Sequence, residues 1–285
     1  MSGFETGREI LSYVALGDSF TEGMDDPYPD SASTPHGRYR GWADRLAEHL
    51  GADGTEVRYA NLAVRGKLIR QIVEEQVPLA VEWRPDLVTI CAGGNDIIRP
   101  GGDPDLVARV FEAAVRRLRA TGAHIVIFTG MDTGFQPVMR HLRGKVATYN
   151  MHLRGIADDH GCDVVDLWSM KVLQDRRAWS VDRLHLSPEG HRRVALKVCE
   201  VLGVAAAGDW REPWPADGPR DWRAARQEDL SWAREYLVPW IGRRLTGRSS
   251  GDGLAPKRPR LERLEALERM QDAARRVAAD TERGV

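Results

Sequence analysis

The sequence lacks the features that mark secreted, membrane-spanning and metal-binding proteins. It has no apolar run near the ~20 residues of a membrane-spanning helix, and residues 1–12 contain no apolar segment typical of a secretory signal. The three cysteines, Cys91, Cys162 and Cys199, are far apart in apolar surroundings, and no Cys-x-x-Cys pair occurs. We therefore expect buried free thiols, no bound metal and a cytoplasmic location.

An excess of charge of either sign is also missing. Lysine and arginine total 41 residues against 42 aspartates and glutamates, which gives a formal net charge of −1. Because binding to nucleic acid or to an anionic membrane depends on positive charge, this balance argues against both partners. The 285 residues are enough for one sizeable α/β domain and an appendage.

What the sequence does contain is an alternation of short apolar runs and amphipathic segments. Strands are predicted at residues 12–16, 56–62, 87–92, 125–128 and 162–167. Helices are predicted at residues 42–50, 67–83, 104–121, in a segment ending at His160, and from Ser187 as an N-cap. A break is expected before Pro78. This alternation predicts a parallel five-stranded sheet with helices on both faces.

Polar residues follow several of these strands, at the sheet edge where α/β proteins form their sites. Ser19 follows the first strand, Gly66 and Asn95 follow the next two, and Asp182 with His185 comes after the last. Taken alone, Ser19 is more often a helix cap than a nucleophile, and Asp182-x-x-His185 is more often a surface turn than a catalytic pair. Their common position at one edge is the stronger indication that they act together.

These residue types suit nucleophilic catalysis. A serine hydroxyl needs a base to take its proton and donors to hold the oxyanion that its attack creates. His185 is the candidate base for Ser19, with Asp182 to orient the imidazole. The candidate oxyanion donors are the amides of Ser19 and Gly66 and the side chain of Asn95. The alternatives are that Gly66 is an ordinary turn glycine and that Asn95 caps a loop.

The order of these residues resembles the SGNH hydrolases, the GDSL family of esterases and lipases. Gly17-Asp18-Ser19 matches the family's first block, with Phe20 where its leucine would stand. The later blocks are matched by Gly66, by Asn95, and by Asp182 with His185. The resemblance covers residues 12–202. It implies a flavodoxin-like three-layer fold, Ser19 as nucleophile, no metal or other cofactor, and hydrolysis of small-molecule carboxylic esters through an acyl-enzyme.

Three other interpretations stay open. The same chemistry would serve a carbohydrate O-deacetylase or a thioesterase. The fold could also be a binding module that has lost turnover, although all the catalytic residue types are present. A nucleotide-binding flavodoxin-like protein is disfavoured because no G-x-G-x-x-G or P-loop follows a strand.

The chain changes character after the predicted hydrolase domain of residues 1–203. Residues 204–245 are predicted as an extension packed on that domain, because they are rich in tryptophan: Trp210, Trp214, Trp222, Trp232 and Trp240. Residues 246–285 are predicted as a linker and, from Arg260, a charged helix that is either a solvated tail or a docking element for a protein partner or a second copy. We therefore expect truncation after Leu245 to leave fold and turnover almost unchanged.

Overall fold

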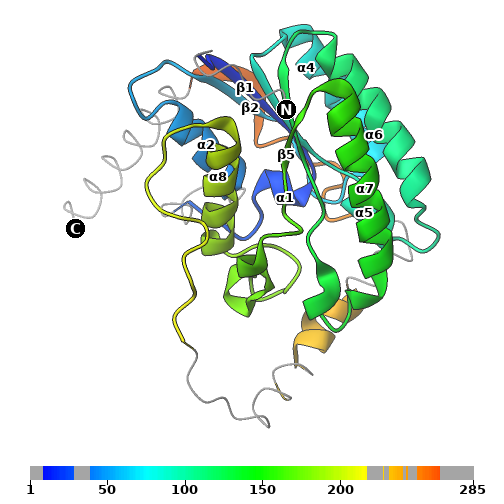
Figure 1. Cartoon of the computed structure of the whole chain (residues 1–285). Helices are drawn as coiled ribbons and strands as arrows, with labels where there is room; N and C mark the ends of the chain where they lie inside the picture. Colours follow the sequence, from blue (N-terminus) through cyan, green and yellow to red (C-terminus); the bar gives the residue numbers. More distant parts are fainter. Residues whose placement is uncertain are drawn as a thin grey trace, which may run out of the picture.

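The computed structural model describes residues 9–28, 39–216, 231–239 and 249–263, with Gln227 and Gly242. Its centre is a six-stranded sheet with the strand order β5-β4-β3-β1-β2-β6. Helices cover both faces of this sheet (Figure 1). The three-layer α/β architecture implied by the family resemblance is therefore confirmed.

Five of the strands run parallel and correspond closely to the apolar runs of the sequence. They are β1 (Ser12–Gly17), β2 (Arg58–Asn61), β3 (Leu87–Cys91), β4 (His124–Phe128) and β5 (Asp163–Val165). β1 lies between β3 and β2 and is buried along its whole length. Because a central parallel strand is covered on both faces, its sequence reads as an unbroken apolar run.

The two faces of the sheet carry different helices and different cores. On one side lie α2 (Gly41–Leu50) and α8 (Pro188–Leu202), and on the other α3 (Ile69–Glu75), α4 (Val77–Trp83), α6 (Pro104–Arg119) and α7 (Arg143–His160) (Figure 1). Alternate side chains of β1 enter the two cores, with Tyr13 on the α2 and α8 side and Val14 on the other. The sheet is thus held by apolar packing on both faces.

Two local predictions about the helices are confirmed. The segment from Lys67 to Trp83 is broken at Gln76, so that Pro78 stands in the first turn of α4, where its missing N–H costs nothing. Ser187 caps α8, and its hydroxyl accepts a hydrogen bond from the Gly190 amide at 3.2 Å. All three cysteines are free, and Cys199 is buried while the other two are half-buried.

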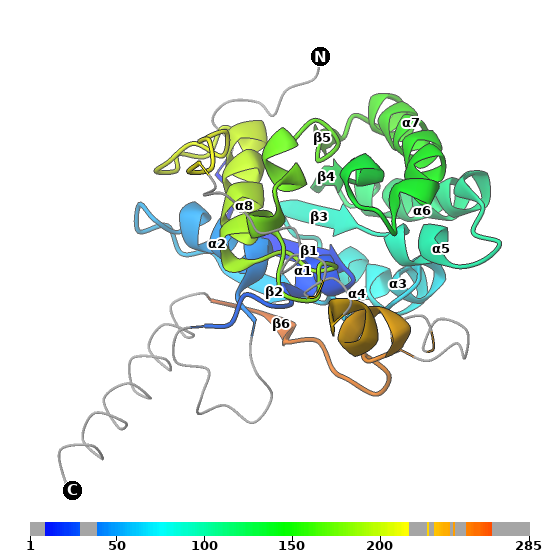
Figure 2. The same ribbon diagram turned by 90° about the horizontal axis from the view of Figure 1, so that it is seen from below.

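The sheet has six strands, and the prediction of five is corrected. After residue 249 the chain returns and adds β6 (Arg258–Arg263) antiparallel to β2 at the sheet edge (Figure 2). Residues from Arg260 were predicted as a charged helix, but up to Arg263 they form this strand. The rest of that predicted helix lies outside the described residues. The edge strand β2 explains why these residues form a strand. Its free backbone N–H and C=O groups offer hydrogen bonds to residues 258–263, which local helix propensity does not take into account.

A buried ion cluster anchors β6. Lys257 Nζ lies 2.8 Å from Asp44 Oδ1, and Arg258 Nη2 lies 3.1 Å from Asp44 Oδ2. The hydroxyls of Tyr28 and Tyr59 each donate to this carboxylate at 2.7 Å. The Asp44 side chain is only 2% exposed. Burial raises the pKa of Asp44, but Arg258 and Lys257 outweigh it and lower the pKa to about 2. Residues 257–258 are therefore part of the packed structure.

The tryptophan-rich segment contacts the domain at separate points. The Trp214 indole donates to the Val172 carbonyl at 2.9 Å, and Trp210 donates to Glu200 at 2.9 Å. Trp232 donates to the Asp182 carbonyl at 2.9 Å, from the helical stretch described over residues 231–239. The remaining two, Trp222 and Trp240, lie outside the described residues. In the part of the chain that is described, no helix has both the length and the apolar character to cross a membrane.

Candidate active site

Ser19 is the first residue of α1 (Ser19–Glu22), directly after the carboxyl end of β1. The cap of this helix is Asp18, whose carboxylate accepts a hydrogen bond from the Phe20 amide at 3.1 Å. The alternative of Ser19 as a helix cap is therefore excluded. The role of Asp18 is thereby explained as well, because its carboxylate is the acceptor that stabilises this turn. The Ser19 hydroxyl is not used as the cap and is available for chemistry.

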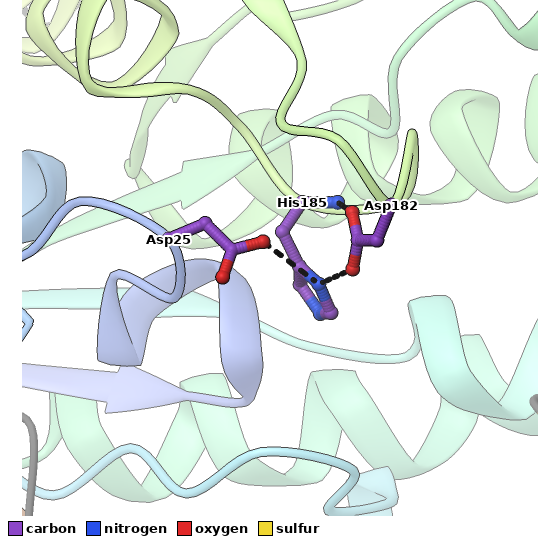
Figure 3. Close-up of side chains that lie close together, drawn as sticks. All are labelled: Asp25, Asp182 and His185. Carbon is purple, nitrogen blue, oxygen red and sulfur yellow. Dashed lines mark hydrogen bonds and ion pairs between the residues drawn. The ribbon is translucent and has the colours of Figure 1, made fainter. Parts of the chain in front are cut away.

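Asp182 and His185 form a hydrogen-bonded pair in the loop before α8 (Figure 3). His185 Nδ1 lies 2.5 Å from one Asp182 oxygen, and the other oxygen accepts from the amides of Leu184 and His185 at 2.9 and 3.0 Å. Because Nδ1 is held by the carboxylate, Nε2 is the nitrogen that remains for proton transfer. The predicted pair of base and orienting acid is thus brought together with the required geometry.

The two groups shift each other's proton affinity. Burial raises the pKa of Asp182, but its bond with His185 and the histidine's charge lower it to about 2. Burial lowers the pKa of His185, and the bond and charge of Asp182, with the charges of Asp25 and Asp18, raise it above its ordinary value. The imidazole is therefore a stronger base than a free histidine, as removal of a proton from serine requires.

A second carboxylate lies beside the imidazole and was missed by sequence reasoning. Asp25 Oδ2 is 3.9 Å from His185 Nδ1 (Figure 3). The Ser180 hydroxyl lies 2.6 Å from Asp25 and 2.8 Å from Asp182, so it links the two acids. In the sequence Asp25 is one of several acids in a polar loop, and no motif distinguishes it.

The same three side chains form a group that a metal ion could occupy, contrary to the expectation of no such cluster. One ligand atom each of Asp25, Asp182 and His185 lies within 4.8 Å of the others. An ion between Asp182 and His185 would stand about 2.0–2.2 Å from each ligand, which requires a wider gap than the 2.5 Å between their bonded atoms. The geometry fits a proton shared by the pair better than a metal bridge.

Ser19 and His185 line the same pocket, which has a volume of about 220 Å³. Its walls are largely apolar and come from α5 (Gly94–Ile98), the β4–α7 loop and α7: Ile97, Ile98, Met131, Phe135, Met139 and Tyr149. The predicted nucleophile and base therefore line one largely apolar cavity, as attack on a bound ester requires.

Asn95 also lines this pocket, but its amide is engaged. Its Nδ2 donates to Asp18 Oδ2 at 2.9 Å and to the Lys67 carbonyl at 3.1 Å. These two bonds use both N–H groups of the side chain. To donate to an oxyanion, Asn95 has to exchange one of them.

Gly66 lies in the turn that follows β2, with a φ of +75° that favours glycine. Among the described residues it is outside the set that lines the pocket. Its neighbours connect it to the site, because the Arg65 amide donates to Glu22 of α1 at 2.7 Å and the Lys67 carbonyl accepts from Asn95. The structure thus brings Ser19, His185 and Asn95 to one pocket, and it connects Gly66 to that pocket only through the bonds of its chain neighbours Arg65 and Lys67.

The chain is similar in sequence and in fold to known proteins. Residues 15–193 match the GDSL-like lipase/acylhydrolase family. TesA is 20% identical with a TM-score of 0.54, over 67% of this chain and 97% of TesA. Axe2, an acetylxylan esterase from Geobacillus stearothermophilus, is 19% identical with a TM-score of 0.57, over 71% and 98% of the two chains. The esterase EstA from Pseudoalteromonas sp. is 14% identical with a TM-score of 0.53, over 68% and 97%.

At these identities the solved structures show a shared fold. Each of the three is matched over nearly its whole length, whereas this chain extends beyond the match. No curated protein sequence matches the chain closely enough to count as a relative.

Proposed function

Because the chain belongs to the GDSL-like lipase/acylhydrolase family, we propose that it is a serine esterase that cleaves carboxylic esters through an acyl-enzyme. The observation that carries this proposal is the shared pocket of Ser19 and His185, with Asp182 bonded to the far side of the imidazole. The esterases among its structural neighbours support the same class of reaction.

In this mechanism the Ser19 oxygen attacks the ester carbonyl while His185 Nε2 takes the hydroxyl proton. The tetrahedral intermediate collapses, its bond to the alcohol oxygen breaks, and His185 returns the proton to the leaving alcohol. Water then attacks the acyl group on Ser19 with the same base, which releases the acid and restores the hydroxyl. Asp182 stabilises the imidazolium formed in each half of the cycle and stays ionised, in line with its low pKa.

The negative charge of each intermediate needs donors near Ser19. The first N–H groups of a helix have no partner within it, so the Ser19 amide at the start of α1 is one candidate. The Gly66 amide and the side chain of Asn95 are the others. Losing one such donor costs about 10²–10³ in kcat in other serine hydrolases, so each is separately testable.

The pocket favours esters with an apolar acyl group. A cavity of about 150 Å³ lined by apolar side chains holds a molecule of the size of benzene, and this one is larger, at about 220 Å³. Two polar side chains of its lining are already paired: Asp132 with Arg143 at 2.6 Å, and Gln136 with the Arg183 carbonyl at 3.3 Å. Among the described lining residues, the buried Thr133 hydroxyl has no hydrogen-bond partner, so it is a polar group left to recognise a sugar hydroxyl in a mostly apolar wall.

An O-deacetylase is the second candidate, because Axe2 shares the fold. The proposed esterase and an O-deacetylase would differ in the length of the acyl chain that they prefer. Each buried CH₂ contributes about 0.8 kcal/mol, so we expect kcat/KM for p-nitrophenyl hexanoate to exceed that for the acetate by about tenfold or more. Equal rates on both, together with faster release of acetate from acetylated xylo-oligosaccharides, would favour the deacetylase.

The proposal as a whole is tested at Ser19. The Ser19→Ala protein should keep the melting temperature of the wild type and lose at least about 10³-fold in kcat/KM on the hexanoate. A fluorophosphonate should label Ser19 in the wild type, located by peptide mass spectrometry, and nothing in the variant. Wild-type activity in Ser19→Ala, or labelling at another serine, would contradict the proposal.

A further inference from the structure

A segment from the far end of the sequence contacts the turn that carries Gly66. The Ser249 hydroxyl donates to the Arg65 carbonyl oxygen at 3.1 Å and accepts from the Gly251 amide at 3.0 Å. In sequence, Ser249 stands 184 positions after Arg65. The contact is therefore long-range, and none of the sequence motifs predicts it.

The acceptor of this bond belongs to the peptide unit whose N–H is the candidate oxyanion donor. The carbonyl of Arg65 and the amide of Gly66 lie in one plane and, in a trans peptide, point in opposite directions. A hydrogen bond that fixes the carbonyl therefore also fixes the direction of the Gly66 N–H. Because Ser249 lies on the carbonyl side, that N–H points away from the C-terminal segment.

The turn at Gly66 and the segment at Ser249 approach each other so closely that only residues without a Cβ fit at two positions. A Cβ on Gly66 would stand 1.9 Å from the Ser249 oxygen, and a Cβ on Gly251 would stand 2.0 Å from the Arg65 oxygen. Both distances are far inside van der Waals contact, so glycine at both positions lets the hydroxyl reach the carbonyl.

Two further contacts hold the turn and the segment in place. Glu22 of α1 accepts the Arg65 amide at 2.7 Å and pairs with the Arg65 guanidinium, which ties the turn to the helix that begins at Ser19. Further along the chain from Ser249, the side chains of Lys257 and Arg258 form ion pairs with buried Asp44. The Arg65–Gly66 peptide is thus held between the helix that begins at Ser19 and the turn at Ser249, which leads into β6.

We propose that Ser249 is a positioning residue for the oxyanion hole, which it serves by holding the Arg65–Gly66 peptide so that the Gly66 amide faces the developing oxyanion. This inference rests on the proposed esterase function. Ser249 does not touch the substrate. It acts through the carbonyl it binds, and the C-terminal segment thereby takes part in catalysis although all the predicted catalytic side chains precede it.

The test is Ser249→Ala in the full chain, with Ser250→Ala as the matched control because Ser250 is the exposed neighbouring serine. We expect kcat on p-nitrophenyl hexanoate to fall about tenfold, part of the 10²–10³ that loss of a whole donor costs, with KM and melting temperature within the range of the control. Inactivation by a fluorophosphonate, which also places negative charge on an oxygen at the site, should slow in the same proportion. Concentrations are set by amino-acid analysis of protein shown to be folded by circular dichroism.

Two outcomes would overturn the inference. One is a kcat for Ser249→Ala equal to that of Ser250→Ala. The other is a loss that appears in KM and melting temperature while the inactivation rate constant stays at the wild-type value, which is the pattern of a merely structural contact. Ser19→Ala is measured in parallel, so that an active Ser19→Ala protein is attributed to failure of the esterase proposal and not of the positioning role.

Discussion

Two carboxylates of this protein, one buried and one half-buried, have the same lowered pKa and different partners. The pKa of both Asp182 and Asp44 is about 2, although burial alone would raise it. Asp182 is paired with a histidine that lines the pocket, whereas Asp44 is paired with Lys257 and Arg258, which are outside the set of residues that line it. A perturbed acid therefore does not by itself identify a catalytic site.

What separates the two clusters is the partner and its access to the cavity. His185 can change its charge near neutral pH and lines the pocket together with Ser19. The charged side chains of the Asp44 cluster are almost inaccessible to solvent, and they come from segments far apart in the sequence. Each Asp44 oxygen accepts a hydrogen bond from a tyrosine hydroxyl and lies against a cation. We propose that the first cluster serves catalysis and the second stability, and each variant below tests one side of this division.

The largest effect is expected at His185. His185→Ala should lower kcat/KM at least about 10³-fold, because it removes the imidazole proposed to take the Ser19 proton, and Asp182→Ala should retain more activity. His152→Ala is the control, since His152 is an exposed histidine paired with Asp105 on the surface. Steady-state kinetics of the three variants measure the loss in kcat/KM, and their melting curves show whether each variant is folded. A His185→Ala enzyme more active than Asp182→Ala would reverse the assigned roles.

The next largest effect is expected on stability, at Arg258. Removing one partner of a buried ion pair costs about 3–5 kcal/mol, so Arg258→Ala should lower the free energy of unfolding in urea by that order. Arg263→Ala is the control, because its ion pair with Glu56 is exposed and worth about 0–1 kcal/mol. If the two variants unfold alike, Asp44 is not an anchor.

The same contacts change the expectation for truncation. A chain ending at Leu245 would lose Ser249, the two cations and β6. We now expect this truncation to lower the melting temperature sharply, in contrast to the near-neutral effect expected from the sequence. Thermal unfolding of the two chain lengths provides the measurement.

A smaller effect is expected on the pH dependence. Since Asp182, Asp25 and Asp18 raise the pKa of His185 and the base must be neutral to act, kcat/KM should rise with pH through an apparent pKa above 6.5. Asp25→Asn removes one of these charges and should move that rise to lower pH, by less than about one unit. Asp105→Asn, at the exposed His152, should leave the profile unchanged. A shift to higher pH in Asp25→Asn would contradict the electrostatic role.

The smallest effect is expected from chelation. Because Asp182 and His185 are bonded to each other at 2.5 Å, dialysis against EDTA should leave kcat/KM unchanged. Loss of activity that Zn²⁺ or Mn²⁺ restores would instead identify the Asp25, Asp182 and His185 group as a metal site.

The sequence predicted the features that depend on local patterns. The five parallel strands follow from apolar runs, the break at Gln76 from Pro78, and the start of α8 from Ser187. Ser19 and His185 could be assigned to one edge because parallel strands deliver their following turns to the same side. Their shared pocket agrees with that reasoning.

The features that were missed depend on partners far away in the chain. β6 is rich in arginine, and on its own looks like a solvated helix; only pairing with β2 and the burial of Arg258 on Asp44 make it a strand. Asp25 and Ser249 are likewise ordinary polar residues until folding places them against His185 and Arg65. A single sequence contains no local signal for such pairs.

The position of β6 also sets an order of events during synthesis. His185 leaves the ribosome about 70 residues before Arg258, an interval of several seconds at about 5–20 residues per second. Throughout that interval β2 is an open sheet edge and Asp44 has neither of its cations. We expect a ribosome-bound chain stalled with residue 248 emerged to be cut readily by protease, and one stalled with residue 263 emerged to resist. Equal resistance would show that the earlier segments close the fold alone. The nascent chain therefore carries Ser19 and His185 well before β6 can complete the sheet.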